Sequence, residues 1–214
     1  MKTTIKLSVL LSIMLVLNSC LGDKKAVEVP EINDTSFVNK NFKGNRIQYA
    51  PEMSACDNIS RTEIAALYNV SEDKVEILDI AKSDRRDANA PPSCQFFIKQ
   101  GDNDFLWLRG SMFMEREVLK GEVNYDNAKL TGTGEEFEEA WALQKSISKS
   151  SEWLDGMGLA ALWNEKNKEL KIKFDGYTLH VYPIKNRMNE NEIAKNRDYK
   201  KAAIAMAKAA GYIN

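Results

Sequence analysis

Leu170-Lys171-Ile172-Lys173-Phe174-Asp175-Gly176-Tyr177-Thr178-Leu179-His180-Val181-Tyr182 is the stretch that decides the fold class of this chain. Apolar and charged side chains alternate from Leu170 to Phe174, which is typical of a β-strand with one buried face. Asp175-Gly176 is a strong signal for a two-residue hairpin turn, because glycine readily adopts the positive φ that such turns require. The stretch therefore predicts two antiparallel strands, and we expect Pro183 to end the second one.

Other strands and helices are predicted on both sides of this hairpin. Apolar periodicity indicates strands around 74–80, 94–98, 105–115 and 159–163, with an irregular strand around 118–123. The strand over 105–115 is apolar on both faces, so we expect it to be covered on both. Capping boxes at Ser60-Arg61-Thr62-Glu63 and Thr133-Gly134-Glu135-Glu136 predict helices that end near Tyr68 and Ser148. The second helix should bury a stripe of five residues, namely Phe137, Ala140, Trp141, Gln144 and Ile147.

A last helix is predicted with Asn189 and Glu192 at its start and Gly211 at its end. The expected order is therefore helix, three strands, helix, three strands, helix. Runs of strands between helices indicate the α+β class, with helices packed on an antiparallel sheet. The two helix-plus-three-strand blocks are compatible with a diverged duplication, although no residue-level repeat accompanies them.

The N-terminus has the three parts of a secretory signal peptide over 1–19: Lys2 and Lys6, an apolar run from Leu7 to Leu17, and small residues before a cleavage point. The run is shorter than the roughly 20 residues that a membrane-spanning helix needs. Leu17-Asn18-Ser19-Cys20 resembles the bacterial lipobox, in which the cysteine is acylated and becomes the new N-terminus. The resemblance implies that Cys20 carries fatty acids such as palmitate and anchors the chain in a membrane. The alternative is a plain secretion signal in which Cys20 is an ordinary thiol.

The cysteine count bears on the same question. The chain has three cysteines, and an odd number in an exported protein asks for an explanation. If Cys20 carries lipid, Cys56 and Cys94 remain as a pair in a compartment that permits disulfides. We expect them to close a loop whose ends lie 38 positions apart, which stabilises a fold by about 3 to 4 kcal/mol. The alternative is two separate buried thiols.

Charge and length narrow the class of protein. Removing the signal takes two lysines from the 30 basic residues, which leaves 28 against 31 acidic residues, a formal charge of −3. No basic excess points to nucleic acid or to an anionic lipid surface. We expect a lipidated N-terminus and tether over 20–55 and a single α+β domain over 56–214. Four apolar side chains in the second half of the tether are expected to dock on the domain: Phe37, Phe42, Ile47 and Tyr49.

Two patterns lie between residues 56 and 211. The first is Cys56, the helix from Ser60, and Cys94-Gln95-Phe96. The second is Gly156-Met157-Gly158-Leu159-Ala160-Ala161-Leu162-Trp163, followed by the hairpin and an Ala-rich terminal helix. Together they resemble a family of small bacterial lipoproteins of uncharacterised function, although Leu159 stands where that family usually has an acid. The resemblance implies an α+β architecture and an envelope location, and it brings no activity with it.

The inventory of catalytic and metal-binding residues is short. His180 is the only histidine, and we interpret it as a surface-strand residue on the face of Thr178 and Tyr182. One histidine without other soft ligands does not build a zinc site, and no G-x-S-x-G elbow occurs. Gly132-Thr133-Gly134 precedes an acidic helix that would repel phosphate, and Asp102-Asn103-Asp104 is better explained as a turn than as a calcium loop. We therefore predict no enzyme, no cofactor and no metal; an enzyme would need a cleft that brings His180 near an Asp or Glu.

Aromatic and basic side chains supply the candidate contact residues. Trp107 and Trp141 are expected in the core. Trp153 lies in a connection, where an aromatic side chain is more often a contact residue, and the alternative is that it plugs the end of the sheet. The charged loop over 83–93, with Arg85 and Arg86, is a second place where a partner could dock.

These observations predict a non-enzymatic lipoprotein of a bacterial cell envelope that acts as a binding or accessory domain on a tether. Leu21 rather than Asp follows Cys20, which by resemblance to enterobacterial sorting implies the outer membrane. The expected partner is an unknown envelope protein or a small ligand, and not nucleic acid. The alternative is a small-ligand carrier in the periplasm or at the cell surface, with a concave sheet face lined by Trp107, Phe113 and Met114.

Overall fold

The hairpin around Asp175-Gly176 lies in the interior of a seven-stranded antiparallel sheet. Its strands are β6 (Glu169–Phe174) and β7 (Tyr177–Lys185), with Phe174 paired to Tyr177 across the turn. Gly176 has a φ of 80°, the positive value that a tight hairpin turn requires. The structure is a computed structural model that describes residues 34–83, 90–185 and 197–214.

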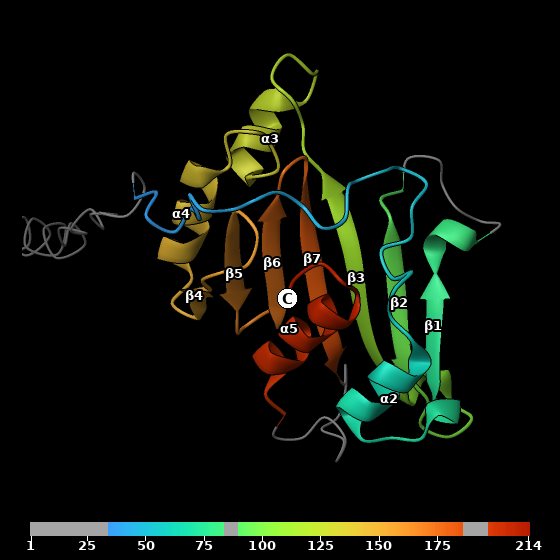
Figure 1. The fold of residues 1–214 in the computed structure, drawn as a ribbon. Coiled ribbons are helices and arrows are strands. Elements are labelled where there is room, and N and C mark those ends of the chain that lie inside the picture. Colours follow the sequence, from blue (N-terminus) through green and yellow to red (C-terminus); the bar gives the residue numbers. More distant parts are fainter. Residues whose placement is uncertain (1–33, 84–89, 186–196) are drawn as a thin grey trace, which may run out of the picture. The chain divides into compact units, whose positions relative to one another are not determined.

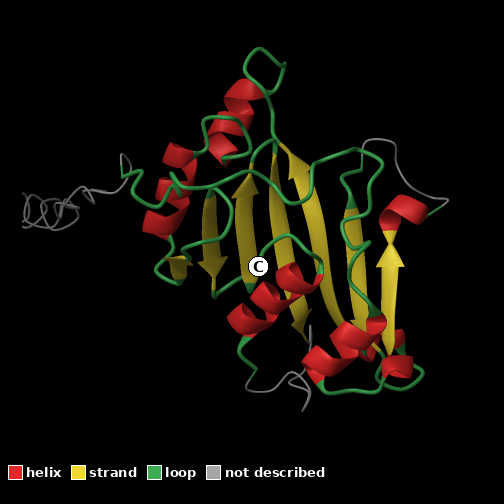
Figure 2. Cartoon of the chain, viewed as in Figure 1, coloured by secondary structure: helices red, strands yellow, loops and turns green. Residues whose placement is uncertain are grey.

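The other elements lie on both sides of this hairpin in the sequence (Figure 1). The strands that precede it are β1 (Val75–Asp79), β2 (Ser93–Ile98), β3 (Leu108–Arg116), β4 (Ser151–Trp153) and β5 (Ala160–Asn164). The helices are α2 (Arg61–Tyr68), α3 (Tyr125–Thr131), α4 (Glu138–Ile147) and, after the hairpin, α5 (Tyr199–Ala209). Short 3-10 turns occupy Glu72–Lys74, Ile80–Lys82 and Asp104–Leu106. The predicted α+β class, an antiparallel sheet with helices and a C-terminal helix, is confirmed (Figure 2).

The sheet consists of two meanders that meet at β3 and β7. Its strand order is β1-β2-β3-β7-β6-β5-β4, and every neighbouring pair is antiparallel. The first meander follows one helix, as predicted, but the second follows two helices and has four strands instead of three. The short strand β4 was not predicted. The two blocks are therefore not equal copies of one helix-plus-three-strand unit.

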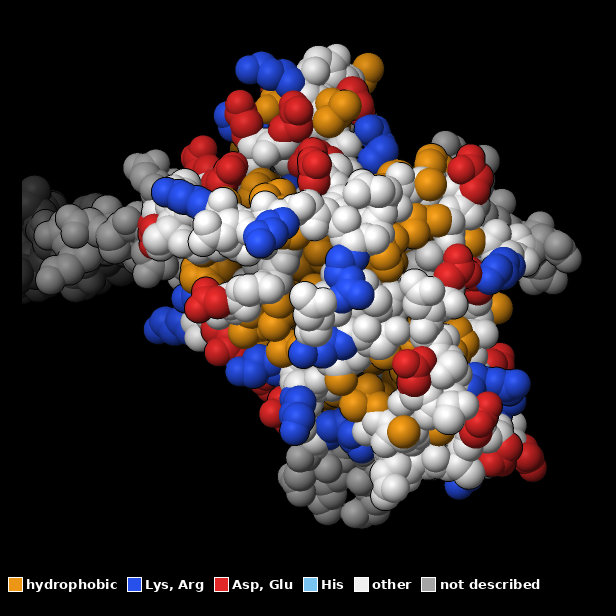
Figure 3. All heavy atoms as spheres, viewed as in Figure 1, with side chains coloured by type: hydrophobic (Ala, Val, Ile, Leu, Met, Phe, Trp, Pro, Cys, Tyr) orange, Lys and Arg blue, Asp and Glu red, His pale blue; other side chains and the backbone are white. Residues whose placement is uncertain are grey.

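One face of the sheet carries the main hydrophobic core, under α2, α5 and the segment over 34–55 (Figure 1). The alternation in the strands is as predicted: Cys94, Phe96 and Ile98 of β2 are fully buried on this face. The capping box at the start of α2 also forms, because the Ser60 hydroxyl accepts from the Glu63 amide and the Glu63 carboxylate accepts from the Ser60 amide. Figure 3 shows this side of the unit, with hydrophobic side chains visible between the covering segments.

The segment over 34–55 packs against this core. Phe42, Ile47 and Tyr49 contact it, as their apolar character predicts, whereas Phe37 packs against a second cluster that includes Phe137 and Trp141. The Tyr177 hydroxyl donates to the Ile47 carbonyl at 2.9 Å, and the Asn39 amide donates to the Leu159 carbonyl at 2.7 Å. The described residues from 34 to 55 belong to the same compact unit as those that follow.

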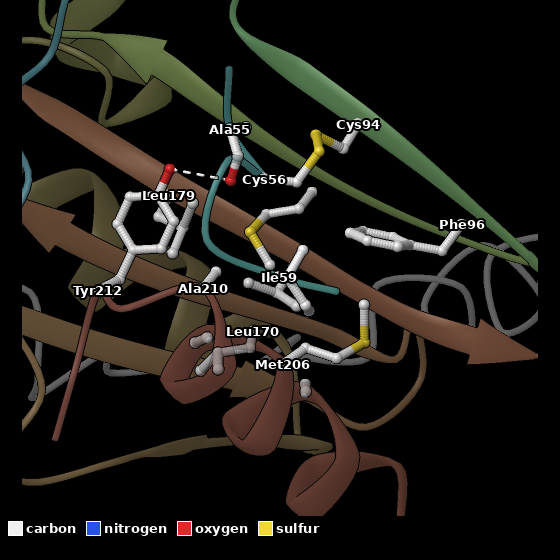
Figure 4. Packing of buried hydrophobic residues seen from close by; sticks show 14 of the residues in the cluster. Ala55, Cys56, Ile59, Cys94, Phe96, Leu170, Leu179, Met206, Ala210 and Tyr212 are labelled. Atoms are coloured by element: carbon white, nitrogen blue, oxygen red, sulfur yellow. Dashed lines mark hydrogen bonds between the residues drawn. A yellow bond between two sulfur atoms is a disulfide. The ribbon is translucent and has the colours of Figure 1, made fainter. Parts of the chain in front are cut away.

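A disulfide between Cys56 and Cys94 fastens this segment to the sheet (Figure 4). Their Cα atoms lie 6.0 Å apart, within the range that a disulfide needs. Both residues are buried, and the nearby Tyr212 hydroxyl donates to the Ala55 carbonyl at 3.1 Å. The chain that enters helix α2 is therefore held on strand β2 covalently and on the C-terminus by a hydrogen bond.

The region between β3 and α4 differs from the prediction. Residues 118–123 form no strand, and only Val118 pairs, in an isolated bridge with Gly134. The predicted capping box at Thr133 does not form either, since α4 begins at Glu138 without a side-chain cap. The reason is that the amides of Thr133 and Gly134 donate to the Ala128 carbonyl and so close the unpredicted helix α3.

Two strand ends also differ from the prediction. Strand β3 begins at Leu108, so the expected start at Phe105 is wrong: Phe105 lies in a 3-10 turn and is 76% exposed. Strand β7 continues through Pro183 to Lys185. Proline is tolerated there because the β6 pairing has ended at Val181 and the β3 register shifts between Arg109 and Ser111.

Helices α4 and α5 agree with the prediction only in part. In α4, Phe137, Ala140 and Trp141 are buried, but Ile147 at the last turn is 72% exposed, because the helix ends beyond the sheet residues that it covers. The expected cap residues Asn189 and Glu192 lie outside the described residues. Helix α5 begins at Tyr199, with the Asp198 carboxylate accepting from the Lys201 amide at 2.9 Å.

Candidate functional site

The second face of the sheet is covered over β5 and β6 and open over β3 and β7. Helix α4 packs Phe137 and Trp141 against Ala160 and Leu162 of β5. No such cluster of buried hydrophobic residues lies on the part of this face formed by β3 and β7 within the described residues. We call this part the open strip, and it consists of Arg109, Ser111, Phe113, Glu115, His180, Tyr182 and Lys185.

Strand pairing fixes the order of side chains along the open strip. Arg109 is the cross-strand partner of Lys185, Ser111 that of Tyr182, and Phe113 that of His180. Neighbours of this kind lie about 5 Å apart at Cβ. Cations therefore lie at one end of the strip, aromatic rings in the middle and Glu115 at the other end.

His180 lies between two carboxylates. Its Nδ1 atom is 2.9 Å from Oε1 of Glu169, and its Nε2 atom is 3.2 Å from Oε2 of Glu115. Burial lowers the pKa of His180, but the hydrogen bonds to Glu115 and Glu169 outweigh burial, and the net pKa is raised. Only 7% of His180 is exposed, so the interpretation as a plain surface-strand histidine is wrong in its exposure, although the shared face with Thr178 and Tyr182 is right.

Glu169 is the carboxylate on which the cluster converges. The Tyr182 hydroxyl donates to its Oε1 atom at 2.6 Å, the same oxygen that contacts His180. Burial raises the pKa of Glu169, but the hydrogen bonds from His180 and Tyr182 outweigh it and the net pKa is lowered. Burial, followed by the hydrogen bond to Glu169, raises the pKa of Tyr182. Glu169 is therefore held as a carboxylate, and Tyr182 as a neutral donor.

Two lysines of β6 lie beneath helix α4 at the edge of the strip. Lys171 donates to Gln144 at 2.9 Å and lies over the Trp141 ring, 4.7 Å from its centroid. Burial is the main reason why the pKa of Lys171 is lowered. Lys173, only 1% exposed, forms an ion pair with Glu117. These lysines hold helix α4 and the chain after β3 over the sheet.

Two hollows open on this face. One, of about 530 Å³, lies between the strip and α3 and is bordered by Glu115, Lys171 and His180 on the sheet side and by Asn127 and Thr131 on the helix side. The other, of about 450 Å³, lies at the cationic end of the strip. It is lined by Gln95, Phe97, Arg109, Ser111, Tyr182 and Lys185. Both volumes lie in the range of small-molecule sites.

The cluster has a geometry that suits binding and positioning more than nucleophilic chemistry. In a catalytic triad one imidazole nitrogen faces a nucleophile while the other is oriented by a carboxylate. Here carboxylates lie at hydrogen-bond distance from both nitrogens of His180. The condition set for an enzyme, a cleft that brings His180 near an Asp or Glu, is met for the carboxylates, but neither nitrogen faces a described nucleophile.

None of the four tryptophans lines either hollow. Trp153 ends strand β4 instead of lying in a connection, because its backbone pairs with Leu162. Its ring stacks on Phe37 with centroids 3.9 Å apart and an interplanar angle of 2°. Phe37 therefore covers one face of the ring, which agrees better with a plug at the sheet end than with a free contact residue. Trp141 is buried as predicted, whereas Trp107 is only half-buried, since it precedes β3 at the end of a 3-10 turn.

The concave face proposed for a ligand carrier does not form. Met114 is fully buried in the main core, whereas Phe113 stacks on His180 on the opposite face. Neighbouring residues of a strand point to opposite faces, so these two side chains do not share a cavity. Sequence reasoning instead missed Arg109, Glu115, Glu169 and Lys185. Period-two spacing with polar neighbours was the only signal for the first three, and the register shift removes even that signal for Lys185.

One group of metal-ligating atoms comes together in the described parts of the chain. Cys56, Asp79 and Cys94 have ligand atoms within 4.8 Å of one another. The two sulfurs are bonded to each other, and thiolates, not disulfide sulfurs, are metal ligands. The group therefore does not offer a metal site in the oxidised protein.

Three predicted site residues lie outside the described residues: Cys20, Arg85 and Arg86. Within the described ranges, no helix has both the length and the apolar character to cross a membrane. Comparison of the chain with protein-family models, with curated proteins and with solved structures finds no match.

Proposed function

We propose that this protein is a lipid-anchored, non-enzymatic binding domain of a bacterial cell envelope, attached to the outer membrane, and that the open strip is its binding surface. The observation that carries the proposal is the unequal covering of the sheet. One face is covered by two helices and the segment over 34–55, while the other leaves aromatic and charged side chains of β3 and β7 at two hollows. Arg109, Phe113 and Tyr182 are half-buried, and partly exposed aromatic and arginine side chains beside a hollow are typical of binding surfaces.

The lipid anchor is supported by the sequence before residue 21 and by the cysteine pairing. Leu17-Asn18-Ser19-Cys20 fits the lipobox pattern, and the other two cysteines of the chain are bonded to each other. Cys20 is therefore the one cysteine left for acylation. A diacylated cysteine anchors a protein stably, whereas a single acyl chain binds only marginally.

The anchor is tested by labelling cells that express the full chain with a clickable palmitate analogue. We expect label on the wild-type protein in the outer-membrane fraction. Cys20→Ser should lose the label and the membrane association. Cys56→Ser, which also removes a cysteine, should keep the label. A wild-type protein without label would refute the anchor.

The binding surface is tested by placing a photo-crosslinking amino acid at Ser111, in the middle of the strip, in living cells. The control position is Lys208, an exposed residue of α5 on the other face. We expect a discrete adduct from Ser111 that is absent from Lys208, detected on gels for a protein partner and by intact mass for a small ligand. Equal or absent adducts at both positions would argue against the strip as the binding surface.

A further inference from the structure

The cationic end of the open strip has a feature that strand pairing does not explain. Arg109 of β3 and Lys185 of β7 are direct cross-strand partners on the same face. Like charges placed directly opposite each other destabilise a sheet. A negative charge bound between these two cations at the hollow would therefore relieve their repulsion.

Among the described residues, no carboxylate forms an ion pair with either cation, although the charge of Glu169 acts on Lys185 from a distance. Arg109 donates to the backbone carbonyl of Asp104 at 3.1 Å, and Lys185 donates to the backbone carbonyl of Asn167 at 3.0 Å. Neither forms an ion pair with a described carboxylate, whereas Lys99 pairs with Glu76 and Arg116 pairs with Glu122. The nearby carboxylate of Glu169 is already engaged by His180 and Tyr182.

The surroundings of the two cations suit an organic anion more than a bare ion. The guanidinium of Arg109 lies over the Phe97 ring, 5.5 Å from its centroid, which holds it in place. Tyr182 offers a second ring at the same hollow, and Ser111 and Gln95 add polar side chains. Burial and the charge of Lys168 lower the pKa of Lys185, and the charge of Glu169 offsets this only in part; a bound anion would offset more of it.

We propose that this hollow binds a small organic oxyanion, a carboxylate or a phosphate ester, with Arg109 and Lys185 on the charged group and the rings of Phe97 and Tyr182 on an apolar body. The guanidinium presents paired N–H donors that match the two oxygens of either group. The volume of about 450 Å³ accommodates a body larger than one ring. This inference rests on the proposed function, because it names the ligand class of the same strip.

The test is calorimetric titration of the full chain in non-ionic detergent with phenylacetate, phenyl phosphate and the neutral analogue phenylacetamide, at constant ionic strength. We expect saturable binding of at least one anion and binding of phenylacetamide that is weaker by about tenfold or more. The anion that binds with the higher affinity identifies the preferred charged group as carboxylate or phosphate.

Variants assign the binding to the hollow. Arg109→Gln should lower the affinity for the anion by about tenfold, which corresponds to about 1.4 kcal/mol. Arg109→Lys should lower this affinity less. Arg61→Gln, at an exposed arginine of α2, is the matched control and should bind as the wild type does. Unchanged melting temperatures show that the variants are folded.

Each other result overturns the inference. Equal binding of phenylacetamide would show that charge is not recognised, and full binding by Arg109→Gln would place the site elsewhere. Failure of both anions to bind, together with a specific adduct at Ser111 in cells, would refute the anion site and leave the binding surface standing. Failure of both experiments would refute the proposed function as well.

Discussion

The ring of Phe113 lies flat on the imidazole of His180, with centroids 4.4 Å apart and an interplanar angle of 7°. The stack shields one face of the imidazole from water, while Glu115 and Glu169 lie at hydrogen-bond distance from its two nitrogens. A ring fixed in this way changes its charge only if the carboxylates around it change theirs. The protonation of His180 is therefore a direct readout of the integrity of the strip.

Replacement of Glu169 by Gln should lower the pKa of His180. The substitution removes one of the two carboxylates that stabilise the imidazolium, so burial then has the larger effect. Because the chain has one histidine, its titration is followed by NMR without assignment. Glu76→Gln, at an exposed carboxylate of β1 that pairs with Lys99, is the control. An unchanged pKa in the Glu169 variant would contradict the hydrogen-bonded geometry.

The cluster should make stability depend on pH in two directions. The pKa of His180 is raised from 6.5, so its contribution is complete below about pH 6.5 and is lost as the pH rises through the folded-state pKa. The pKa of Glu169 is lowered from 4.5, so its contribution is complete above about pH 4.5 and is lost as the pH falls through the lowered value. In denaturant unfolding, the cluster should therefore stabilise the fold most between about pH 4.5 and about pH 6.5. In His180→Gln the decline on the alkaline side should disappear; a decline of equal size in both proteins would assign it to another group.

Breaking the buried ion pair between Lys173 and Glu117 should be costly. Lys173→Met leaves the carboxylate of Glu117, 12% exposed, without its partner, and we expect a loss of about 3 kcal/mol in the free energy of unfolding. The double variant with Glu117→Leu should recover most of the loss, because no charge is then left unpaired. The control is the same cycle at the exposed pair Lys200 and Glu152, which should show little coupling. A double variant as unstable as the single one would show that packing, not charge, dominates at Lys173.

The two glycines of Gly156-Met157-Gly158 should differ in their tolerance of alanine. Both have positive φ, 77° and 59°. A Cβ at Gly158 would collide with the carbonyl oxygen of Lys173, whereas a Cβ at Gly156 meets nothing within 4 Å. We expect Gly158→Ala to cost about 2 to 4 kcal/mol and Gly156→Ala about 1 kcal/mol, measured by denaturant unfolding. Similar losses at both positions would mean that backbone conformation alone sets the requirement.

Local signals in the sequence predicted the parts of the fold that depend on local chemistry. The Asp175-Gly176 turn, the alternation in β2 and the capping box at Ser60 are each decided within a few residues, and the structure has all three. Thr133 has the same capping pattern as Ser60, but the amides there close helix α3 instead. At Thr133 the Ala128 carbonyl of helix α3 accepts from these amides. The local capping pattern does not reveal this competing acceptor.

The open strip could not be predicted, because it depends on the pairing of β3 with β7. These strands are more than 60 positions apart in the sequence, and a shift of one residue in their register would move every side chain to the other face. The bulge between Arg109 and Ser111 changes that register within the strip itself. His180 stands out in the sequence as the only histidine, but its contacts with Glu115 and Glu169 depend on the strands on both sides of β7.

The disulfide between Cys56 and Cys94 also sets the path of mechanical load. If the chain is anchored through Cys20 as proposed, a pull on the unit enters through the segment over 34–55, whose contacts with the core can break one at a time. Peeling stops at Cys56, because the force then passes through the disulfide into β2, a strand paired on both sides by β1 and β3. Shearing a strand paired on both sides breaks many hydrogen bonds together, so the bridge acts as a mechanical stop that protects α2 and the rest of the fold.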